Sequence, residues 1–153
     1  MLLNTSVPFC HSLIYLIALS ADKLPAVKRE KFERMLPLSR RSLQIAVREK
    51  VKIALGTDTI SSDRSNPLSH GRNMKELYWA TVAGMSPIEA IEACTANIPE
   101  TLGPRAPLSG QIKPGYDADM IAVSSNPLDD IMVLCDARNV THVWKGGKLV
   151  KAP

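Results

Sequence analysis

A short apolar run at residues 51–55 is the feature that most constrains how this chain can fold. It follows a long charged stretch with helical spacing, residues 23–50, and it precedes a mainly polar stretch, residues 57–71. A partly β-branched run of this length, closed by Gly56, is typical of a strand buried in a parallel sheet. A helix that leads into a buried strand is the unit of α/β layers, so the sequence predicts an α/β fold.

Helices are predicted on both sides of that strand. In the stretch before it, apolar residues recur at helical intervals, and Pro37 predicts a break or kink that leaves two helical pieces. After it, residues 72–83 have an apolar helical face, and Gly84 is suited to end that helix.

A capping signal marks the start of the next helix. Ser86 can cap, Pro87 suits the first helical position and Glu89 completes an S-x-x-E box. The sequence therefore predicts a helix that begins at Pro87 and runs to Cys94. A short helical turn is expected over residues 95–102, and the proline-rich passage after it indicates a boundary between two structural regions.

Beyond residue 110 the pattern changes to short strands with sharp turns. Strands are predicted at residues 111–112, 118–123, 140–144 and 149–151, and a short helix at residues 129–134. Gly146 and Gly147 stand between the last two strands and predict a hairpin turn.

Charge and cysteine content narrow the class of protein. The formal charge is +4, and residues 22–52 hold ten Lys or Arg against four acidic residues. These charges alternate with apolar residues at helical spacing and lack interleaved aromatic residues, which favours a solvated helix face over nucleic-acid binding. The three cysteines have no CxxC spacing, which predicts neither a disulfide framework nor a zinc knot and favours the reducing cytoplasm.

An apolar run at residues 13–19 leaves two interpretations open. It ends among small residues, as the core of a signal peptide does, so secretion is the alternative to a cytoplasmic location. No Lys or Arg precedes the run, however, and a buried barrel strand has the same composition. The run is too short to cross a bilayer, so no membrane-spanning segment is predicted.

Asp58 is the first candidate for a functional residue. A carboxylate just past the carboxyl end of a parallel strand projects into the face of an α/β layer where ligands bind. The alternative is that Asp58 caps a turn, and its spacing alone leaves both roles open. Other polar residues are expected to be structural, namely His142 on a predicted strand and Asp117 and Asp119 in a predicted turn.

Four blocks of sequence carry a family resemblance. They are VKIALGTD at residues 51–58, HGRNMKELYWATVAGMSPIEAIEACTANIPETLG at 70–103, GQIKPGYDADMIAVSSNPLDDI at 110–131 and VTHVWKGGKLV at 140–150. Together they resemble the imidazolonepropionase-like and prolidase-like branch of the amidohydrolase superfamily. The first block is similar to the family's eighth barrel strand with its terminal Asp, and the second to the helices that follow it.

The resemblance implies the C-terminal portion of a (β/α)8 TIM barrel together with strands of a small β-sandwich. On this interpretation residues 1–20 are an unmatched leader that contains the signal-like run. Residues 21–104 are the last barrel units, and residues 105–153 are the sandwich segment.

The resemblance also implies a divalent metal, usually zinc, which activates water to hydrolyse a carbon-nitrogen bond, mainly non-peptide, in a small amide or cyclic amide. Asp58 takes the place of the catalytic proton acceptor and metal ligand. His70, in the long loop after it, is a candidate substrate-binding residue, and the alternative is that it caps or orients that loop. A catalytic zinc needs three protein ligands. The resemblance implies that further ligands include a His-x-His pair. Because His11, His70 and His142 form no such pair, we expect this chain to be incomplete or inactive by itself.

Two alternatives to an enzyme remain open. The chain is either a non-catalytic interaction module, which binds through exposed strand edges and apolar helix faces, or a truncated gene product. The expected macromolecular partner is a second copy of the chain or a complementing chain.

Overall fold

The computed structural model describes residues 8–12, 24–59, 61–66 and 69–153. The apolar run at residues 13–19 lies outside these residues. Among the helices described, none is long and apolar enough to cross a bilayer.

Two parallel strands form the centre of the first half of the molecule. β1 (Phe9–Ser12) pairs with β2 (Ile53–Gly56) in a register that aligns Phe9 with Ile53 and Ser12 with Gly56. β2 confirms the strand predicted from the apolar run. β1 was not predicted, because four residues without apolar alternation carry no strand signal of their own and are ordered here by pairing with a distant segment.

A single long helix, α2 (Ala26–Arg48), connects the two strands. The predicted division at Pro37 is wrong, since that residue lies inside a continuous helix. Proline removes one hydrogen bond from the ladder, and the other turns of this 23-residue helix remain. Only Leu43 and Ala46, both in its C-terminal third, are buried.

Two short helices cover β2, and both were predicted. They are α3 (Lys75–Val82) and α4 (Pro87–Cys94). The predicted capping box is present: the Ser86 N–H donates to Glu89 Oε2 over 2.8 Å, and Ser86 Oγ accepts from the Glu89 N–H over 3.4 Å. The expected helical turn after α4 is the 3-10 helix η2 (Pro99–Arg105), interrupted at Gly103 where φ is +69°.

The C-terminal part forms a three-stranded antiparallel sheet in the order β3 (Met120–Val123), β4 (Val140–Lys145) and β5 (Lys148–Lys151). The predicted hairpin is present, and Gly146 and Gly147 have the positive φ values that its turn requires. No strand forms at residues 111–112, where Ile112 is 89% exposed. Between β3 and β4 lie two 3-10 helices, η3 (Ile131–Cys135) and η4 (Ala137–Asn139).

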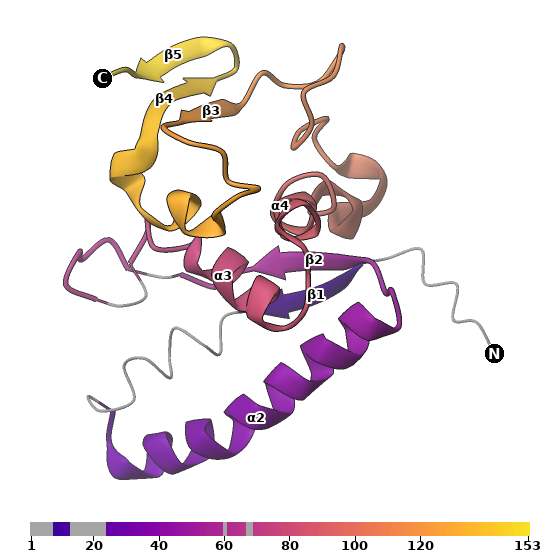
Figure 1. Ribbon diagram of the computed structural model, residues 1–153, viewed down its shortest axis with the longest axis vertical. Helices are drawn as coiled ribbons and strands as arrows, with labels where there is room; N and C mark the ends of the chain where they lie inside the picture. Colours follow the sequence, from indigo (N-terminus) through magenta and orange to yellow (C-terminus); the bar gives the residue numbers. More distant parts are fainter. Residues whose placement is uncertain (1–7, 13–23, 60, 67–68) are drawn as a thin grey trace.

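One hydrophobic core joins the two parts. Its buried members are Leu43 and Ala46 of α2, Ile53 and Leu55 of β2, Leu77 and Ala80 of α3, Ala83 directly after α3, Ala90 and Ala93 of α4, and Ile131 and Leu134 of η3. The alanines allow the helices to approach closely. Figure 1 shows α2 at one end of the long axis, the β1–β2 pair with α3 and α4 in the middle, and the three-stranded sheet at the other end.

A glycine fixes the passage between the two parts. Gly110 has a φ of +78°, and a Cβ atom added there would lie 2.4 Å from the carbonyl oxygen of Thr95. Only glycine permits this backbone-to-backbone approach at the end of α4.

Candidate functional site

Asp58 lies at the carboxyl end of β2, two residues past Gly56, and is exposed. Its φ is +46°, and Lys50 is the other non-glycine residue with positive φ in the described part of the chain. A left-handed conformation costs about 1 kcal/mol in a residue with a Cβ atom, although the short polar side chain of Asp tolerates it better than most. Such strain is often found where a side chain is aimed for function.

Asn73 holds the threonine side chains on both sides of Asp58. Its Nδ2 donates to Thr57 Oγ1 and to Thr59 Oγ1, both over 2.9 Å, and its Oδ1 accepts from the Gly71 N–H over 3.0 Å. Asn73 stands just before α3, so the start of that helix is tied to the end of β2. No local pattern predicts this role, because an Asn in a polar loop is ordinary.

His70 lies in the long loop between β2 and α3. Its backbone N–H donates to the Ser61 carbonyl over 2.9 Å, and Ser61 and Ser69 form an isolated parallel bridge. Ser69 is buried, whereas the His70 side chain is exposed. Backbone contacts therefore join the two ends of this loop at Ser61 and residues 69–70, and the His70 side chain at this junction is exposed to solvent.

His11 and His142 lie away from the carboxyl end of β2. His11 is buried on β1, pairs in register with Leu55, and its Nε2 is 3.1 Å from Ser39 Oγ of α2. Its side chain therefore faces the helix layer, where burial lowers the pKa of the imidazole. His142 stacks on Trp144 in the small sheet with ring centroids 5.4 Å apart.

The predicted turn acids also have structural partners. Asp119 Oδ1 accepts from the Gly146 N–H over 2.7 Å, and the Asp119 N–H donates to the Asp117 carbonyl over 2.9 Å. In the described parts of the chain, no three His, Cys, Asp or Glu residues come together in a way that could hold a metal ion. Asp58 is thus a single possible metal ligand, and the residues present do not fit a catalytic zinc, which needs three protein ligands.

A cavity of about 350 Å³ is lined by residues of β2 and of the two helices that cover it, and Asp58 is not among them. Its lining residues are Ala54, Leu55, Gly56, Thr57, Asn73, Met74, Glu76, Leu77, Cys94, Ile98 and Thr101. Burial raises the pKa of the Cys94 thiol to about 11, and this thiol donates to the Ile91 carbonyl over 3.3 Å. Cys94 is therefore protonated near neutral pH and is no nucleophile.

Glu76 is the unusual residue of this cavity. It is 3% exposed, and its Oε1 atom is buried without a hydrogen-bond partner among the described residues. Burial raises the pKa of the carboxyl to about 7. In sequence Glu76 looks like an ordinary acidic residue in the first turn of a helix, which is why it was not predicted as a site residue.

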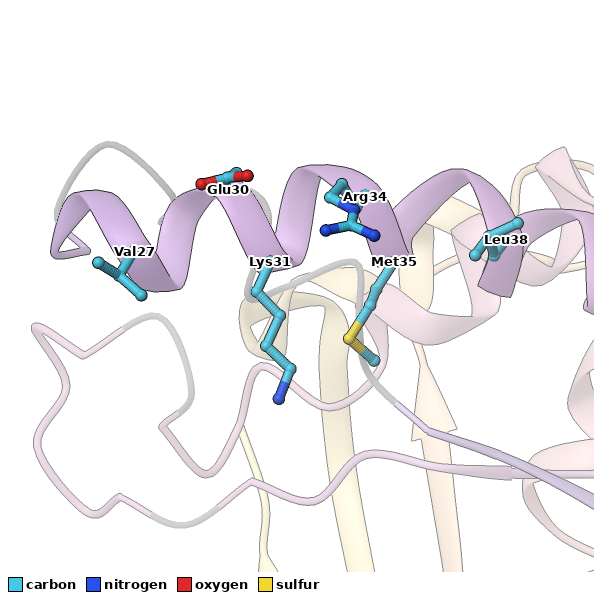
Figure 2. Close-up of a pocket in the computed structure, with 6 residues that line it drawn as sticks. All are labelled: Val27, Glu30, Lys31, Arg34, Met35 and Leu38. Atoms are coloured by element: carbon cyan, nitrogen blue, oxygen red, sulfur yellow. The ribbon is translucent and has the colours of Figure 1, made fainter.

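A second hollow, of about 460 Å³, lies along α2. Figure 2 shows the six side chains that line it, which are Val27, Glu30, Lys31, Arg34, Met35 and Leu38. All six belong to one helix, and neither Asp58 nor His70 is among them. This hollow marks a helix face that carries apolar and charged side chains together, and it brings no catalytic groups together.

Comparison with known proteins agrees with the resemblance found in the sequence. The profile of the amidohydrolase family matches residues 12–150. The chain is 49% identical over 114 residues to an ochratoxinase of Aspergillus niger, which covers 74% of this chain and 22% of that protein.

Solved structures give the same result. The crystal structure of the A. niger ochratoxinase superposes with a TM-score of 0.76 at 40% identity, over 95% of this chain and 32% of that one. A Xaa-Pro dipeptidase with bound methionine superposes with a TM-score of 0.73 at 32% identity, over 91% of this chain and 33% of that one. The chain thus spans about a third or less of the length of these relatives. On the extent of the match, the chain belongs to the amidohydrolase family.

Proposed function

We propose that this chain is the C-terminal part of a hydrolase of carbon-nitrogen bonds, mainly non-peptide, and that Asp58 supplies the carboxylate at the end of the eighth strand of a (β/α)8 barrel. The observation that carries the proposal is the setting of Asp58. It stands in a left-handed conformation at the carboxyl end of a parallel strand, and Asn73 fixes the threonines on either side of it.

On this proposal β1, α2 and β2 are two successive barrel strands with their connecting helix. The antiparallel sheet β3–β5 is part of the small sandwich domain. A β-α-β connection between adjacent parallel strands is the repeating unit of such barrels.

The metal that amidohydrolases typically use has to be held by residues beyond Asp58. The described residues offer one carboxylate where three protein ligands are needed. We therefore expect no turnover from this chain by itself and activity only when another polypeptide completes the site. His70, exposed on the closed loop, is proposed to contact a small amide substrate at the rim of the completed site.

A chimera tests the role of Asp58. Residues 12–150 replace the matching segment of the A. niger ochratoxinase, and release of the product of amide hydrolysis is followed with the substrate of that enzyme. We expect the chimera to be active and Asp58→Asn to reduce its kcat by at least about 100-fold, since one catalytic carboxylate contributes on that scale.

Asp63→Asn is the matched control, because Asp63 is an exposed carboxylate of the same loop. An active chimera in which both variants have equal kcat would show that Asp58 is not a catalytic residue.

Elemental analysis of the chain by itself is a second check. One tightly bound zinc per chain would contradict the conclusion that this chain holds too few metal ligands.

A non-catalytic interaction module is the second candidate, favoured by the exposed face of α2. Val27 is 83% exposed and Leu38 is 66% exposed on one stretch of this helix (Figure 2). Light scattering with size-exclusion chromatography tests it. Self-association that the double variant Val27→Lys/Leu38→Lys abolishes, and that Val150→Lys on β5 leaves unchanged, would favour this candidate.

A further inference from the structure

The position of the Asp58 side chain depends on the residues next to it. Within the described residues, no hydrogen bond or ion pair reaches its carboxylate. The direction of this carboxylate is therefore set by the backbone of Asp58, which has the left-handed φ of +46°. A residue with a Cβ atom keeps such a conformation only where the surrounding structure holds it. Whatever fixes the neighbours of Asp58 thus also fixes its carboxylate.

The nitrogen of the Asn73 amide holds both of these neighbours. It carries two hydrogens, one for each of two acceptors. Those acceptors are Thr57 Oγ1 and Thr59 Oγ1, each 2.9 Å from Asn73 Nδ2 in a partly buried setting. Threonine is stiff at χ1, so a hydroxyl that is held also restrains the Cα atom of its residue. One side chain therefore restrains the chain directly before and directly after Asp58.

The oxygen of the same amide holds a different segment. Asn73 Oδ1 accepts from the Gly71 N–H over 3.0 Å. Gly71 directly follows His70, and its φ of +89° lies in the region that favours glycine. The His70 N–H donates to the Ser61 carbonyl over 2.9 Å. The backbone that carries the His70 side chain is therefore held at its own N–H and at that of the next residue.

From these contacts we infer that Asn73 is a positioning residue with two separable roles. Its nitrogen holds Asp58 for the chemical step, and its oxygen holds the part of the loop that presents His70 to the substrate. The inference rests on the proposed function, in which Asp58 is the catalytic carboxylate. A catalytic group has to stand within a narrow range of distance and angle from the reacting atoms, so a small displacement costs a large factor in rate.

The experiment measures kcat and KM separately in the ochratoxinase chimera. Thr57→Val/Thr59→Val keeps the shape of both side chains and removes only the acceptors of the amide nitrogen. We expect kcat to fall at least about tenfold while KM stays the same. Asn73→Ala also removes the acceptor for the Gly71 N–H, so KM should rise at least about threefold in addition to the loss of kcat. His70→Ala should raise KM and leave kcat unchanged.

Two controls separate positioning from a loss of folded protein. Ser86→Ala removes the cap of α4 and lowers stability, but its kcat per folded molecule should equal that of the parent. In the Asp58→Asn background, Asn73→Ala should change the residual kcat by less than about twofold, because no carboxylate is left to place. A general disturbance of the fold would instead lower this residual kcat by the same factor as in the parent.

NMR relaxation of the chain by itself tests the positioning of Asp58 without any measurement of turnover. The order parameters of the Asp58 and Thr59 amides are expected to fall from about 0.85 to below about 0.6 in Asn73→Ala. They should keep their values in Ser86→Ala. Unchanged order parameters in Asn73→Ala would overturn the inference, and this result decides even for a chimera that is inactive.

The two proposals fail in different ways. In an active chimera, full kcat in Asp58→Asn contradicts the proposed function, whatever the order parameters show. A large loss of kcat in Asp58→Asn, together with normal kcat in Asn73→Ala and in Thr57→Val/Thr59→Val, contradicts the inference alone.

Discussion

At the scale of single residues, Glu76 makes the stability of the chain depend on pH. Burial raises the pKa of its carboxyl from 4.5 to about 7. The folded chain therefore holds more protons than the unfolded chain between these two values, and the free energy of unfolding falls as the pH rises through this window, by on the order of 3 kcal/mol. Urea unfolding at pH 4.5, 6 and 7.5 measures this decrease.

Glu76→Gln is expected to remove most of that pH dependence, because the amide does not titrate. Glu92→Gln, at an exposed residue of α4, should leave this pH dependence unchanged. Cys94 is the other titratable side chain of the cavity, and its pKa of about 11 keeps it uncharged throughout the window. A slope that persists in Glu76→Gln would show that another group is responsible.

Asn73 carries a second prediction at this scale. Asn73→Ala removes three hydrogen bonds, two to the Thr57 and Thr59 hydroxyls and one from the Gly71 N–H, and should lower the free energy of unfolding by about 1–3 kcal/mol. Asn73→Asp keeps the acceptor for the Gly71 N–H but loses both donors, so a similar loss is expected. Urea unfolding gives both values, and faster exchange of the Thr59 amide would place the loosening next to Asp58.

The sequence predicted Asp58 at the end of a buried strand, because strand composition and a terminal carboxylate are local features. It could not predict Glu76 or Asn73 as site residues. Both stand near the start of a helix in polar surroundings, and only packing against β2 buries one and brings the other to Thr57. Whether a charged residue is exposed depends on tertiary packing, which cannot be predicted from the spacing of residues along a helix.

At the scale of elements, α4 was predicted to the residue because its signals are local. Ser86 accepts from the Glu89 backbone, and hydrogen bonds from the Ser86 side chain and then its backbone hold the pKa of the Glu89 carboxyl below its usual range. Ser86→Ala should lower the free energy of unfolding by about 1 kcal/mol. Thermal unfolding compared with Ser125→Ala, at an exposed serine, is the measurement.

The elements that sequence reasoning missed depend on distant partners. β1 has four residues and exists through its register with β2, 44 positions away at the Phe9–Ile53 pair. Pro37 was expected to divide α2, but a helix tolerates one lost hydrogen bond when the residues around it favour helix. Residues 111–112 have strand-like composition and lack a partner strand in the described part of the chain.

At the scale of the whole molecule, the α/β part and the antiparallel sheet were both predicted, together with a boundary near residues 103–107. The close packing of these two parts against each other was not predicted. Ile131 and Leu134 of η3 pack into the core beneath α3, and the Cys135 thiol donates to the Met74 carbonyl over 3.2 Å. A contact across 61 positions has no signature in local composition, so sequence reasoning separates regions that share one interior.

The uneven packing of α2 has a consequence for proteolysis. Its buried residues, Leu43 and Ala46, lie in the C-terminal third, while the preceding turns carry the exposed basic residues Lys28 and Arg34. Within the described residues, the turns before Leu43 bury no side chain. Helical turns that bury little surface open at low cost in free energy, and a protease cuts the opened backbone. Brief trypsin treatment followed by mass spectrometry should therefore detect cleavage at residues 28–34 before any within 43–56. First cuts next to Arg48 would mean that the helix is anchored from its other end.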